Sequence, residues 1–358
     1  MRVLLATRYG PMGASSRLRA YQYLPYLKQQ GIEVTSAPLF PPSYQDDLYF
    51  GRPTRWLQVT HAYLKRLQNV LKSSAYNLIW IEYELFPWLP SFAERALAFA
   101  RIPFVVDYDD AIFHRYDSHR RGLVRLLLGR KIDRIMRSAT VVIAANQYII
   151  DRAASSGARH IEYLPTVVDL RRYPMKTPTD KGPFTVGWVG SPSTASYLTT
   201  LEPVLRDFCE GHDARMVAIG ARNIALTGFP LELRRWSEQS EVQDILQFDV
   251  GIMPVPDQPF ERGKSGYKLI QYMACGLPVI ASPIGINAKI VQHGVNGFVA
   301  SNNFEWRRAL DSLYDSPPLR KSLGQVGRTL VEAEYNTEVT APRLATVLRS
   351  AAGAAGAS

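Results

Sequence analysis

Residues 248–300 read FDVGIMPVPDQPFERGKSGYKLIQYMACGLPVIASPIGINAKIVQHGVNGFVA, and this stretch decides the fold. It opens with a short apolar run, Val250–Val255, which is typical of a buried strand. A polar loop follows, and apolar residues then return at helical spacing between Leu269 and Ala274. Gly276 and Pro278 end that helix, after which a second apolar run begins. The order strand, loop, helix, strand predicts a βαβ unit of a parallel sheet.

The loop of this unit, residues 257–266, predicts an anion site. In a βαβ unit the loop at the carboxyl end of the strand and the first helical turn face the ligand crevice, where free backbone N–H groups favour an anion. Two glycines stand in or beside this loop together with three cations, namely Gly263, Gly266, Arg262, Lys264 and Lys268. We expect the loop to bind a diphosphate.

The same stretch resembles the donor-binding segment of the GT-B glycosyltransferases of family 4. Met-Ala-Cys-Gly-Leu-Pro-Val at 273–279 matches the end of the family pattern Glu-Ala-Met-Ala-x-Gly-x-Pro-Val-Val, and Gly294-x-Asn296-Gly297 matches the turn that follows it. The resemblance implies an α/β chain of GT-B fold. In that fold two Rossmann-like β/α/β domains face a cleft, and a C-terminal helix crosses back to the first domain.

The chain departs from the family at the two glutamates of the E-x7-E signature, whose positions hold Gly263 and Gln271. In the family the first glutamate contacts the transferred sugar and the second holds the nucleotide ribose. The resemblance therefore implies that Gln271 can hydrogen-bond a ribose, whereas Gly263 offers a sugar no side chain.

A second departure lies at the family's phosphate-side strand, Phe-x-Gly-Arg-x4-Lys-Gly. Here Ser191 follows Gly190, so the arginine and lysine are missing, and Arg262, Lys264 and Lys268 are the replacement cations. The donor contacts that we expect are Gly10, Gly13, Gly190, Ser191, Arg262, Lys264, Ser265, Gly266, Tyr267, Lys268 and Gln271.

The amino-terminal end repeats the strand, loop, helix pattern. Residues 1–6 are expected to form an apolar strand, and a helix with an apolar face is expected from an N-cap at Ser15 or Ser16 to about Gln30. The loop RYGPMGASSR between them holds Gly10 and Gly13, where a Rossmann-like half presents backbone amides. Such turns are often only structural, and the resemblance to the family's glycine-containing loop adds the diphosphate interpretation.

An acidic cluster follows the apolar strand that starts at Pro103. Asp107-x-Asp109 could ligate Mn²⁺ or Mg²⁺ through hard oxygen atoms, and the acids could equally be a helix N-cap. The resemblance implies that the protein needs no metal and no cofactor, because family 4 enzymes hold the diphosphate with amides and cations. In the family a histidine or an acid of this loop reaches the donor sugar, so the candidate catalytic residues are Asp109, Asp110 and His114, with Lys264 on the donor loop.

The pattern predicts two domains. Residues 1–170 form the Rossmann-like acceptor domain, 171–182 a linker, and 183–335 the Rossmann-like donor domain. Residues 336–350 form the crossover helix, and the low-complexity tail at 351–358 is expected to be disordered.

Charge separates the two halves. Residues 1–182 hold 26 Lys and Arg against 15 Asp and Glu, whereas residues 183–358 hold 16 against 17, so the whole excess of +10 lies in the first half. Residues 115–137 carry eight basic side chains among apolar ones at helical spacing, which predicts a basic amphipathic helix. The expected partner is an anionic membrane surface. Nothing resembles a nucleic-acid recognition motif.

Targeting signals are missing from the sequence. No apolar run approaches the roughly 20 residues that cross a bilayer, and the amino-terminal run is too short for a signal peptide. Cys209 and Cys275 stand far apart and suggest neither a disulfide framework nor zinc. The expected location is cytoplasmic, with peripheral attachment to the inner membrane face.

The resemblance implies a retaining, metal-independent glycosyltransferase that moves a sugar from a nucleotide-diphosphate sugar to a lipid-linked or glycan acceptor in cell-surface glycan assembly. Two alternatives remain. Sugar-nucleotide 2-epimerases share the GT-B architecture and would need catalytic acids, which only the cluster at 107–110 supplies. A non-catalytic partner protein would account for the missing glutamates, while the three cations beside Gly263 and Gly266 argue against it.

Overall fold

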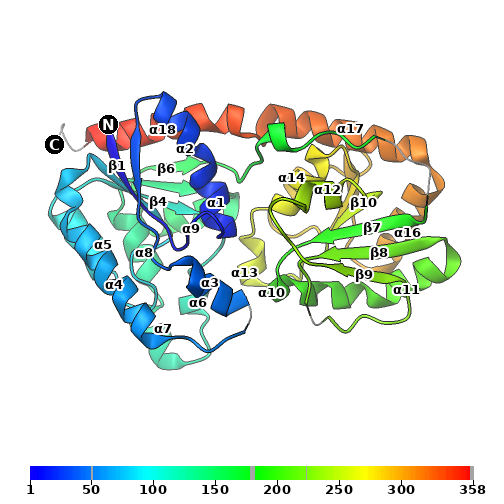
Figure 1. Ribbon diagram of the computed structural model, residues 1–358, viewed down its shortest axis with the longest axis horizontal. Helices are drawn as coiled ribbons and strands as arrows, with labels where there is room; N and C mark the ends of the chain where they lie inside the picture. The colour runs from blue at the N-terminus through cyan, green and yellow to red at the C-terminus, as the bar shows by residue number, and fades with distance from the viewer. Residues whose placement is uncertain (50, 178–181, 223, 355–358) are drawn as a thin grey trace. The chain divides into compact units, whose positions relative to one another are not determined.

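The computed structural model describes residues 1–358 except 50, 178–181, 223 and 355–358. The chain divides into two compact units. The first comprises Met1–Thr166, Gly263–Ser265 and Thr337–Ser358, and the second comprises Val167–Arg262 and Gly266–Asn336. Each unit holds one six-stranded parallel sheet with helices on its faces (Figure 1), which confirms the predicted α/β GT-B class.

The first sheet has the order β2-β1-β3-β4-β5-β6. Its strands are β1 (Arg2–Ala6), β2 (Glu33–Ser36), β3 (Leu78–Glu82), β4 (Phe104–Tyr108), β5 (Val141–Ala144) and β6 (Ile161–Tyr163). The central strands are buried on both faces and therefore read as continuous apolar runs. Because β2 lies on one side of β1 and β3 on the other, the loops after β1 and β3 diverge, which opens a crevice at their carboxyl ends.

Short helices cover the first sheet. They are α1 (Ala14–Arg19), α2 (Leu24–Gln29), α3 (Pro42–Tyr49), α4 (Trp56–Leu71), α5 (Phe92–Phe99), α6 (His114–Asp117), α7 (Gly122–Leu128), α8 (Lys131–Ser138) and α9 (Gln147–Ser155), with 3₁₀ turns η1 (Tyr21–Tyr23) and η2 (Ser73–Ala75). The single helix expected up to Gln30 is wrong: it is divided into α1, η1 and α2. Pro25 has no N–H for the preceding turn, so the helix restarts there.

The predicted basic helix at 115–137 is also wrong, because the segment forms α6, α7 and α8. Gly122 and Gly129 border α7. The apolar side chains of α8 are buried in the core, and Lys131 at its start is buried with them. The exposed apolar side chains of this segment are the three leucines of α7, Leu123, Leu126 and Leu127.

The second sheet has the order β12-β11-β10-β7-β8-β9. Its strands are β7 (Phe184–Val189), β8 (Ala214–Ile219), β9 (Leu231–Arg234), β10 (Val250–Met253), β11 (Val279–Ala281) and β12 (Gly297–Val299). Strand order reverses between β7 and β10, so the loops that follow these two strands diverge and open this unit's crevice.

Helices and 3₁₀ turns also surround the second sheet. They are η3 (Leu170–Arg172), α10 (Pro192–Ala195), η4 (Ser196–Leu201), α11 (Glu202–Gly211), α12 (Glu241–Ile245), α13 (Pro259–Arg262), α14 (Tyr267–Ala274), α15 (Asn287–Ile290), α16 (Asn303–Asp315) and α17 (Pro317–Glu334). The strand, loop, helix, strand order of residues 248–300 is therefore β10, α13, α14 and β11, as predicted.

The last helix, α18 (Thr337–Gly353), belongs to the first unit, as expected of a crossover helix. Thr340 Oγ1 lies 3.0 Å from Tyr23 OH, and Arg343 donates to Tyr163 O at 2.7 Å. The helix continues through residues 351–353, which were predicted to be disordered. Residues 355–358 lie outside the described residues, as do 178–181 of the predicted linker.

Candidate functional site

Two loops of the second unit meet at its crevice. The first follows β7 and contains Gly190 and Ser191. The second follows β10 and leads through α13 to Gly266 and α14. Both loops leave the carboxyl ends of the neighbouring strands between which the strand order reverses, the place where open α/β sheets bind ligands.

Gly266 fixes the start of α14. It is the N-cap residue and has a left-handed backbone with φ of 67°. A Cβ built on it would lie 2.6 Å from Ile290 Cδ1, so only glycine fits without a shift. The N–H groups of the first helical turn have no partner within the helix. Groups of this kind at a helix N-terminus favour an anion.

Lys268 places a cation beside the first loop. Its Nζ lies 4.6 Å from the centroid of the Trp188 ring and 3.5 Å from Thr194 Oγ1. The loop is further ordered by the Ser191 N–H, which donates to Thr194 Oγ1 at 3.3 Å. A positive charge, hydroxyl groups and helix-terminal amides therefore gather at one edge of the sheet.

Arg262, a second predicted cation, forms a bidentate ion pair with Asp257. Its Nε donates to Oδ1 at 2.6 Å and its Nη2 to Oδ2 at 3.1 Å. These hydrogen bonds lower the pKa of Asp257. Both side chains are about half exposed, so the pair adds little stability. Arg262 therefore brings less net positive charge to the loop than its sequence position suggests.

Gln271 is buried and turned toward Tyr173. Its Nε2 donates to Tyr173 OH at 2.9 Å, and the same hydroxyl lies 3.4 Å from Tyr267 OH. Tyr173 OH also lies 3.5 Å from Glu241 Oε2, and Trp236 Nε1 donates to Glu241 Oε1 at 2.6 Å. Burial raises the pKa of Tyr173 well above its usual range. The residue expected to hold a ribose is therefore part of a side-chain network.

In the first unit the glycine loop rests on a buried carboxylate. Gly13 N donates to Gly10 O at 2.9 Å in a turn, and Gly13 is the N-cap residue of α1. Glu82, at the end of β3, accepts from the Arg8 N–H at 2.8 Å and from Ser16 Oγ at 2.6 Å. Burial raises the pKa of Glu82 to about 7. This carboxylate therefore fixes both ends of the loop.

The acids after β4 are held by different partners. Tyr83 OH donates a short hydrogen bond to Asp109 Oδ1. Tyr83 is also a rare non-glycine residue at positive φ, 62°, which is typical of functional sites. Asp107 pairs with Arg19, whose Nε donates to Oδ1 at 2.8 Å. Burial raises the pKa of Asp107 to about 6, although Arg19 favours its charged form.

The two acids of the Asp107-x-Asp109 pair therefore bind different side chains, Arg19 and Tyr83. Among the described residues, no group of three or more His, Cys, Asp and Glu side chains could hold a metal ion. Metal independence stays a prediction. Asp110 is half-buried and its backbone carbonyl accepts from Ile112 N at 2.8 Å.

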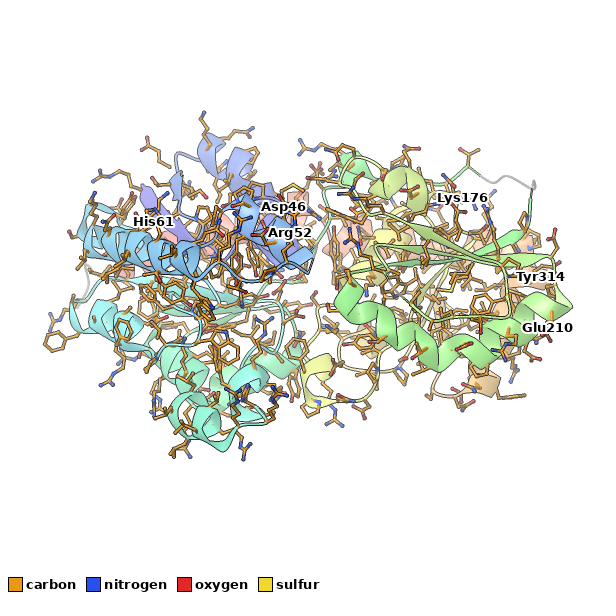
Figure 2. All side chains as sticks on the ribbon, turned by 60° about the horizontal axis from the view of Figure 1, so that its bottom comes forward. Asp46, Arg52, His61, Lys176, Glu210 and Tyr314 are labelled. Atoms are coloured by element: carbon orange, nitrogen blue, oxygen red, sulfur yellow. The ribbon has the colours of Figure 1, made fainter. Side chains whose placement is uncertain are left out.

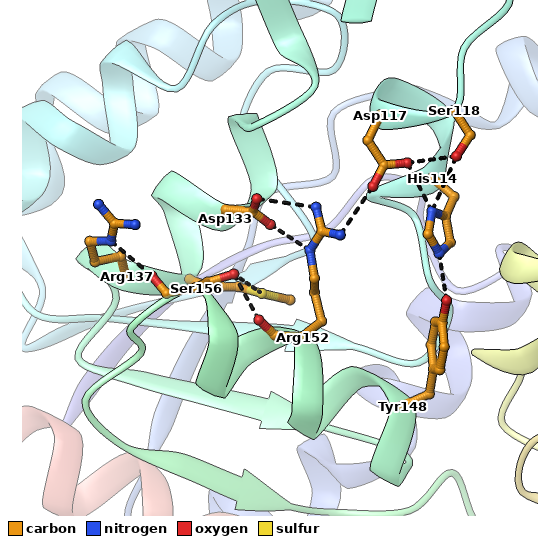
Figure 3. Close-up of polar contacts among 9 residues, drawn as sticks. His114, Asp117, Ser118, Asp133, Arg137, Tyr148, Arg152 and Ser156 are labelled. Atoms are coloured by element: carbon orange, nitrogen blue, oxygen red, sulfur yellow. Dashed lines mark hydrogen bonds and ion pairs between the residues drawn. The ribbon is translucent and has the colours of Figure 1, made fainter.

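His114 begins α6 and has both ring nitrogens in hydrogen bonds (Figure 3). Nδ1 lies 2.8 Å from Asp117 Oδ1, and Nε2 lies 2.8 Å from Tyr148 OH. Against the desolvation that burial imposes, hydrogen bonds from His114 and Ser118 lower the pKa of Asp117. Arg152 completes the network by pairing with Asp117 at 3.1 Å. The histidine is thus held by a charged network and contacts its surroundings through Tyr148.

Three residues of the donor loop, Gly263–Ser265, group with the first unit. Asn146 Nδ2 donates to Gly263 O at 2.8 Å, and Asn146 Oδ1 caps α9 by accepting from Ile149 N at 3.0 Å. A Cβ on Gly263 would lie 2.3 Å from Ala111 Cβ, which explains why the first signature glutamate has no counterpart here. Lys264 and Ser265 are half-buried.

Several residues of these networks carry no sequence signal of their own. Glu82 and Asn146 lie at or just after strand ends, and Tyr173 lies within the predicted linker, 171–182. For Glu82 a signal existed, because an acid at the end of an otherwise apolar strand is costly to bury. Tyr173 is 98 positions from Gln271, a separation that no local pattern links.

Comparison with known proteins relates both units to glycosyltransferases. Residues 2–166 match the family model described as glycosyl transferase 4-like domain, and residues 257–330 match the one described as glycosyl transferases group 1. The chain belongs to the family 4-like GT-B glycosyltransferases.

A GDP-mannose-dependent monoacylated alpha-(1-6)-phosphatidylinositol monomannoside mannosyltransferase of Corynebacterium glutamicum is 24% identical over 247 residues, which are 62% of this chain and 65% of that protein. A D-inositol 3-phosphate glycosyltransferase of Pseudarthrobacter chlorophenolicus is 30% identical over 79 residues, 22% of this chain and 18% of that protein. The matches therefore span less than two thirds of these relatives' lengths.

Two solved structures share the fold over nearly the whole chain. Sucrose-phosphate synthase of Thermosynechococcus elongatus superimposes with a TM-score of 0.74 at 16% identity, covering 99% of this chain and 100% of that one. The Anabaena protein HepE in complex with UDP-glucose gives 0.69 at 17% identity, covering 98% and 100%. At these identities the likeness supports the fold alone.

Proposed function

We propose that the protein is a retaining glycosyltransferase that uses a nucleotide-diphosphate sugar as donor. The observation that carries this proposal is the start of α14, where the left-handed Gly266 presents helix-terminal amides beside Lys268 at the reversal of strand order. Family membership supports it. So does the name of the Corynebacterium glutamicum relative, a GDP-mannose-dependent mannosyltransferase.

The chemistry follows from where charge develops. As the glycosidic bond to the donor breaks, the leaving diphosphate gains negative charge, and preorganised amides and cations stabilise that charge. Gly266, Lys264, Ser265 and Lys268 would supply these groups. A departing phosphate oxygen could accept the acceptor's proton, which would leave no need for a general-base pair.

A metal ion is not part of this proposal. The donor loop offers lysines and amides for the diphosphate, and the two acids of the Asp107-x-Asp109 pair are bonded to Arg19 and Tyr83. Activity in the presence of a chelator such as EDTA is therefore expected to equal that with added Mg²⁺ or Mn²⁺.

The acceptor that we propose is a lipid-linked molecule or a growing glycan at the cytoplasmic face of the inner membrane. The relative from Corynebacterium glutamicum acts, by its name, on an acylated phosphatidylinositol mannoside. The attachment that we propose is peripheral, through the basic first unit. Among the described helices, none has the length and apolar character of a membrane span.

The test is incubation with UDP-, GDP- and ADP-sugars, with release of nucleotide and the fate of the sugar measured together. Nucleotide release with an anomerically retained sugar supports the proposal. A C2-epimerised sugar with nucleotide release would indicate the epimerase alternative. Nucleotide binding without any turnover, in the presence of lipid and glycan acceptors, would indicate a non-catalytic partner protein.

A further inference from the structure

Over a large part of the first unit, the exposed charged side chains are all positive. Between Arg52 and Arg137, every residue of which is described, thirteen lysine and arginine residues are exposed, and every aspartate and glutamate is buried or half-buried. The acids point inward to partners such as Lys131 and Arg19. The second unit differs, because exposed acids such as Glu210, labelled in Figure 2, stand among its basic residues.

The same segment holds most of the large apolar side chains that reach solvent. Twelve of the nineteen exposed large hydrophobic residues of the described chain lie between 52 and 137. On α4, Leu57, Leu64 and Leu71 recur every seven residues and so form one stripe along the helix. His61, labelled in Figure 2, lies on the same helix, and α7 adds Leu123, Leu126 and Leu127.

Ring contacts connect the exposed aromatic side chains to α4 and α6 through the buried rings of Phe86 and Tyr116. Tyr63 of α4 packs on Phe86 with ring centroids 5.7 Å apart, and Phe86 packs on the exposed Phe92 at the start of α5, also at 5.7 Å. The exposed Trp88 lies 5.3 Å from Tyr116 of α6 and 5.7 Å from His119, which precedes α7. Figure 1 shows α4, α5 and α7 along the outer edge of the first unit.

Buried side chains fix the loop that contains Phe86 and Trp88. Lys131 forms a short buried ion pair with Glu84 and donates to Phe86 O at 2.6 Å. Trp88 N donates to Tyr116 OH at 3.1 Å, and the Trp88 backbone is left-handed, with φ of 63°. The exposed tryptophan is therefore presented by a fixed backbone.

We propose that the exposed faces of α4 and α7, with Trp88 and Phe92 between them, dock this protein on an anionic phospholipid bilayer. Cations attract the charged headgroups, while leucine and aromatic side chains enter the interface between headgroups and acyl chains. The proposal deepens the proposed function, because it names the surface that brings the enzyme to a membrane-bound acceptor. It differs from the expected amphipathic helix at 115–137, since α8 contributes its apolar face to the core instead.

Other occupants fit the surface less well. Two copies of a face whose exposed charges are all positive repel each other, which disfavours self-association through it. Nucleic acid would engage the cations and could stack bases on Trp88 and Phe92, but it would leave the aliphatic stripe of Leu57, Leu64 and Leu71 exposed to water.

The test is flotation of the full chain with vesicles of phosphatidylcholine alone and of phosphatidylcholine mixed equally with phosphatidylglycerol, without any sugar nucleotide. The protein is expected to float with the mixed vesicles only, and high salt is expected to weaken binding. Two variants probe the two components: Leu57→Gln/Leu64→Gln/Leu71→Gln removes the apolar stripe, and Arg120→Glu/Arg121→Glu reverses charge beside α7. Each is expected to weaken partitioning by at least about tenfold.

Matched controls lie on the second unit. Phe304→Ser removes an exposed aromatic side chain, and Arg308→Glu/Lys321→Glu reverses two exposed charges. Both controls should float like the unaltered protein. The substitutions Arg120→Glu and Arg121→Glu place negative charge just before α7, and negative charge stabilises a helix at its N-terminus. This variant should therefore fold even if the leucine variant does not.

The proposal is overturned if the unaltered protein stays out of the mixed-vesicle fraction, if it floats equally with phosphatidylcholine alone, or if both variants float like the controls. Retention on single-stranded RNA with no flotation would identify a nucleic-acid surface instead, and would equally overturn it. Because flotation requires no turnover, loss of sugar transfer with intact flotation would count against the proposed function alone.

Discussion

In the first unit the loops at the carboxyl edge of the sheet rest on buried charged side chains, whereas in the second unit they rest on glycine, hydroxyl groups and half-exposed cations. Glu82 and the pair of Asp107 with Arg19 lie inside the first edge. Gly266 and Lys268 lie at the second. Burying charge fixes a loop but makes stability depend on pH and on each partner. Half-exposed cations keep part of their hydration and carry a smaller desolvation cost.

The largest effect is expected where the first unit buries a complete ion pair. Lys131→Met leaves the Glu84 carboxylate buried without its cation, while Tyr116 OH still donates to its two oxygens at 2.8 and 2.9 Å. The free energy of unfolding should fall by about 3–5 kcal/mol. Chemical denaturation measures it. The double variant Lys131→Met/Glu84→Gln should recover much of the loss, and an equally unstable double variant would contradict the pairing argument.

Next in size is the pH dependence that Glu82 gives the first unit. Its pKa is about 7 in the fold against an ordinary value of 4.5, so the folded state binds the proton more tightly than the unfolded state. Stability should therefore fall as pH rises from about 4.5 to 7, by on the order of 3 kcal/mol.

Glu82→Gln keeps an oxygen that can accept from Ser16 and Arg8 N and removes the ionisation. The variant should gain stability over the unaltered protein as pH rises from 5 to 8, which unfolding at a series of pH values would show. A constant difference between the two proteins across that range would mean that Glu82 does not titrate there.

A smaller loss of stability is expected in the second unit, where the loop depends on a glycine, Gly266, and not on a buried charge. Gly266→Ala should cost about 2 kcal/mol, because the left-handed backbone and the approach to Ile290 both disfavour a Cβ. Gly294→Ala is the control: its φ is 76°, and a Cβ there meets nothing within 4 Å. The control should therefore cost less in thermal unfolding, and equal costs would show that the contact with Ile290 relaxes freely.

The two units also differ in how much of their structure could be predicted from the sequence. In the second unit the motif at 273–279 and the helical spacing from Leu269 predicted the βαβ unit and its loop, because those signals are local. In the first unit the continuous apolar and basic spacing of 115–137 predicted one amphipathic helix. The pairing of Lys131 with Glu84, 47 positions away, draws α8 into the core instead, and no local period reports such a contact.

The candidate site divides in the same way. Gly266 and Lys268 were predicted as donor contacts, and the structure places both at the start of α14, beside the loop after β7. Their role in donor binding stays a prediction. Gln271 was expected to meet a ribose, yet it bonds to Tyr173, because the helix turns this buried side chain toward a partner that is distant in sequence. The catalytic roles of Asp109, Asp110, His114 and Lys264 stay predictions.

The most direct measurement is a thermal-shift titration with UDP, GDP and ADP, in EDTA and in Mg²⁺, on the unaltered protein and on Lys264→Ala and Lys268→Ala. A ligand at a hundredfold excess over its dissociation constant stabilises the fold by about 2.7 kcal/mol. We expect one nucleoside diphosphate to raise the melting temperature without metal, and each lysine variant to bind it at least about tenfold more weakly. No shift with any nucleotide, or unchanged affinity in both variants, would contradict the assignment of the α14 loop as the donor site.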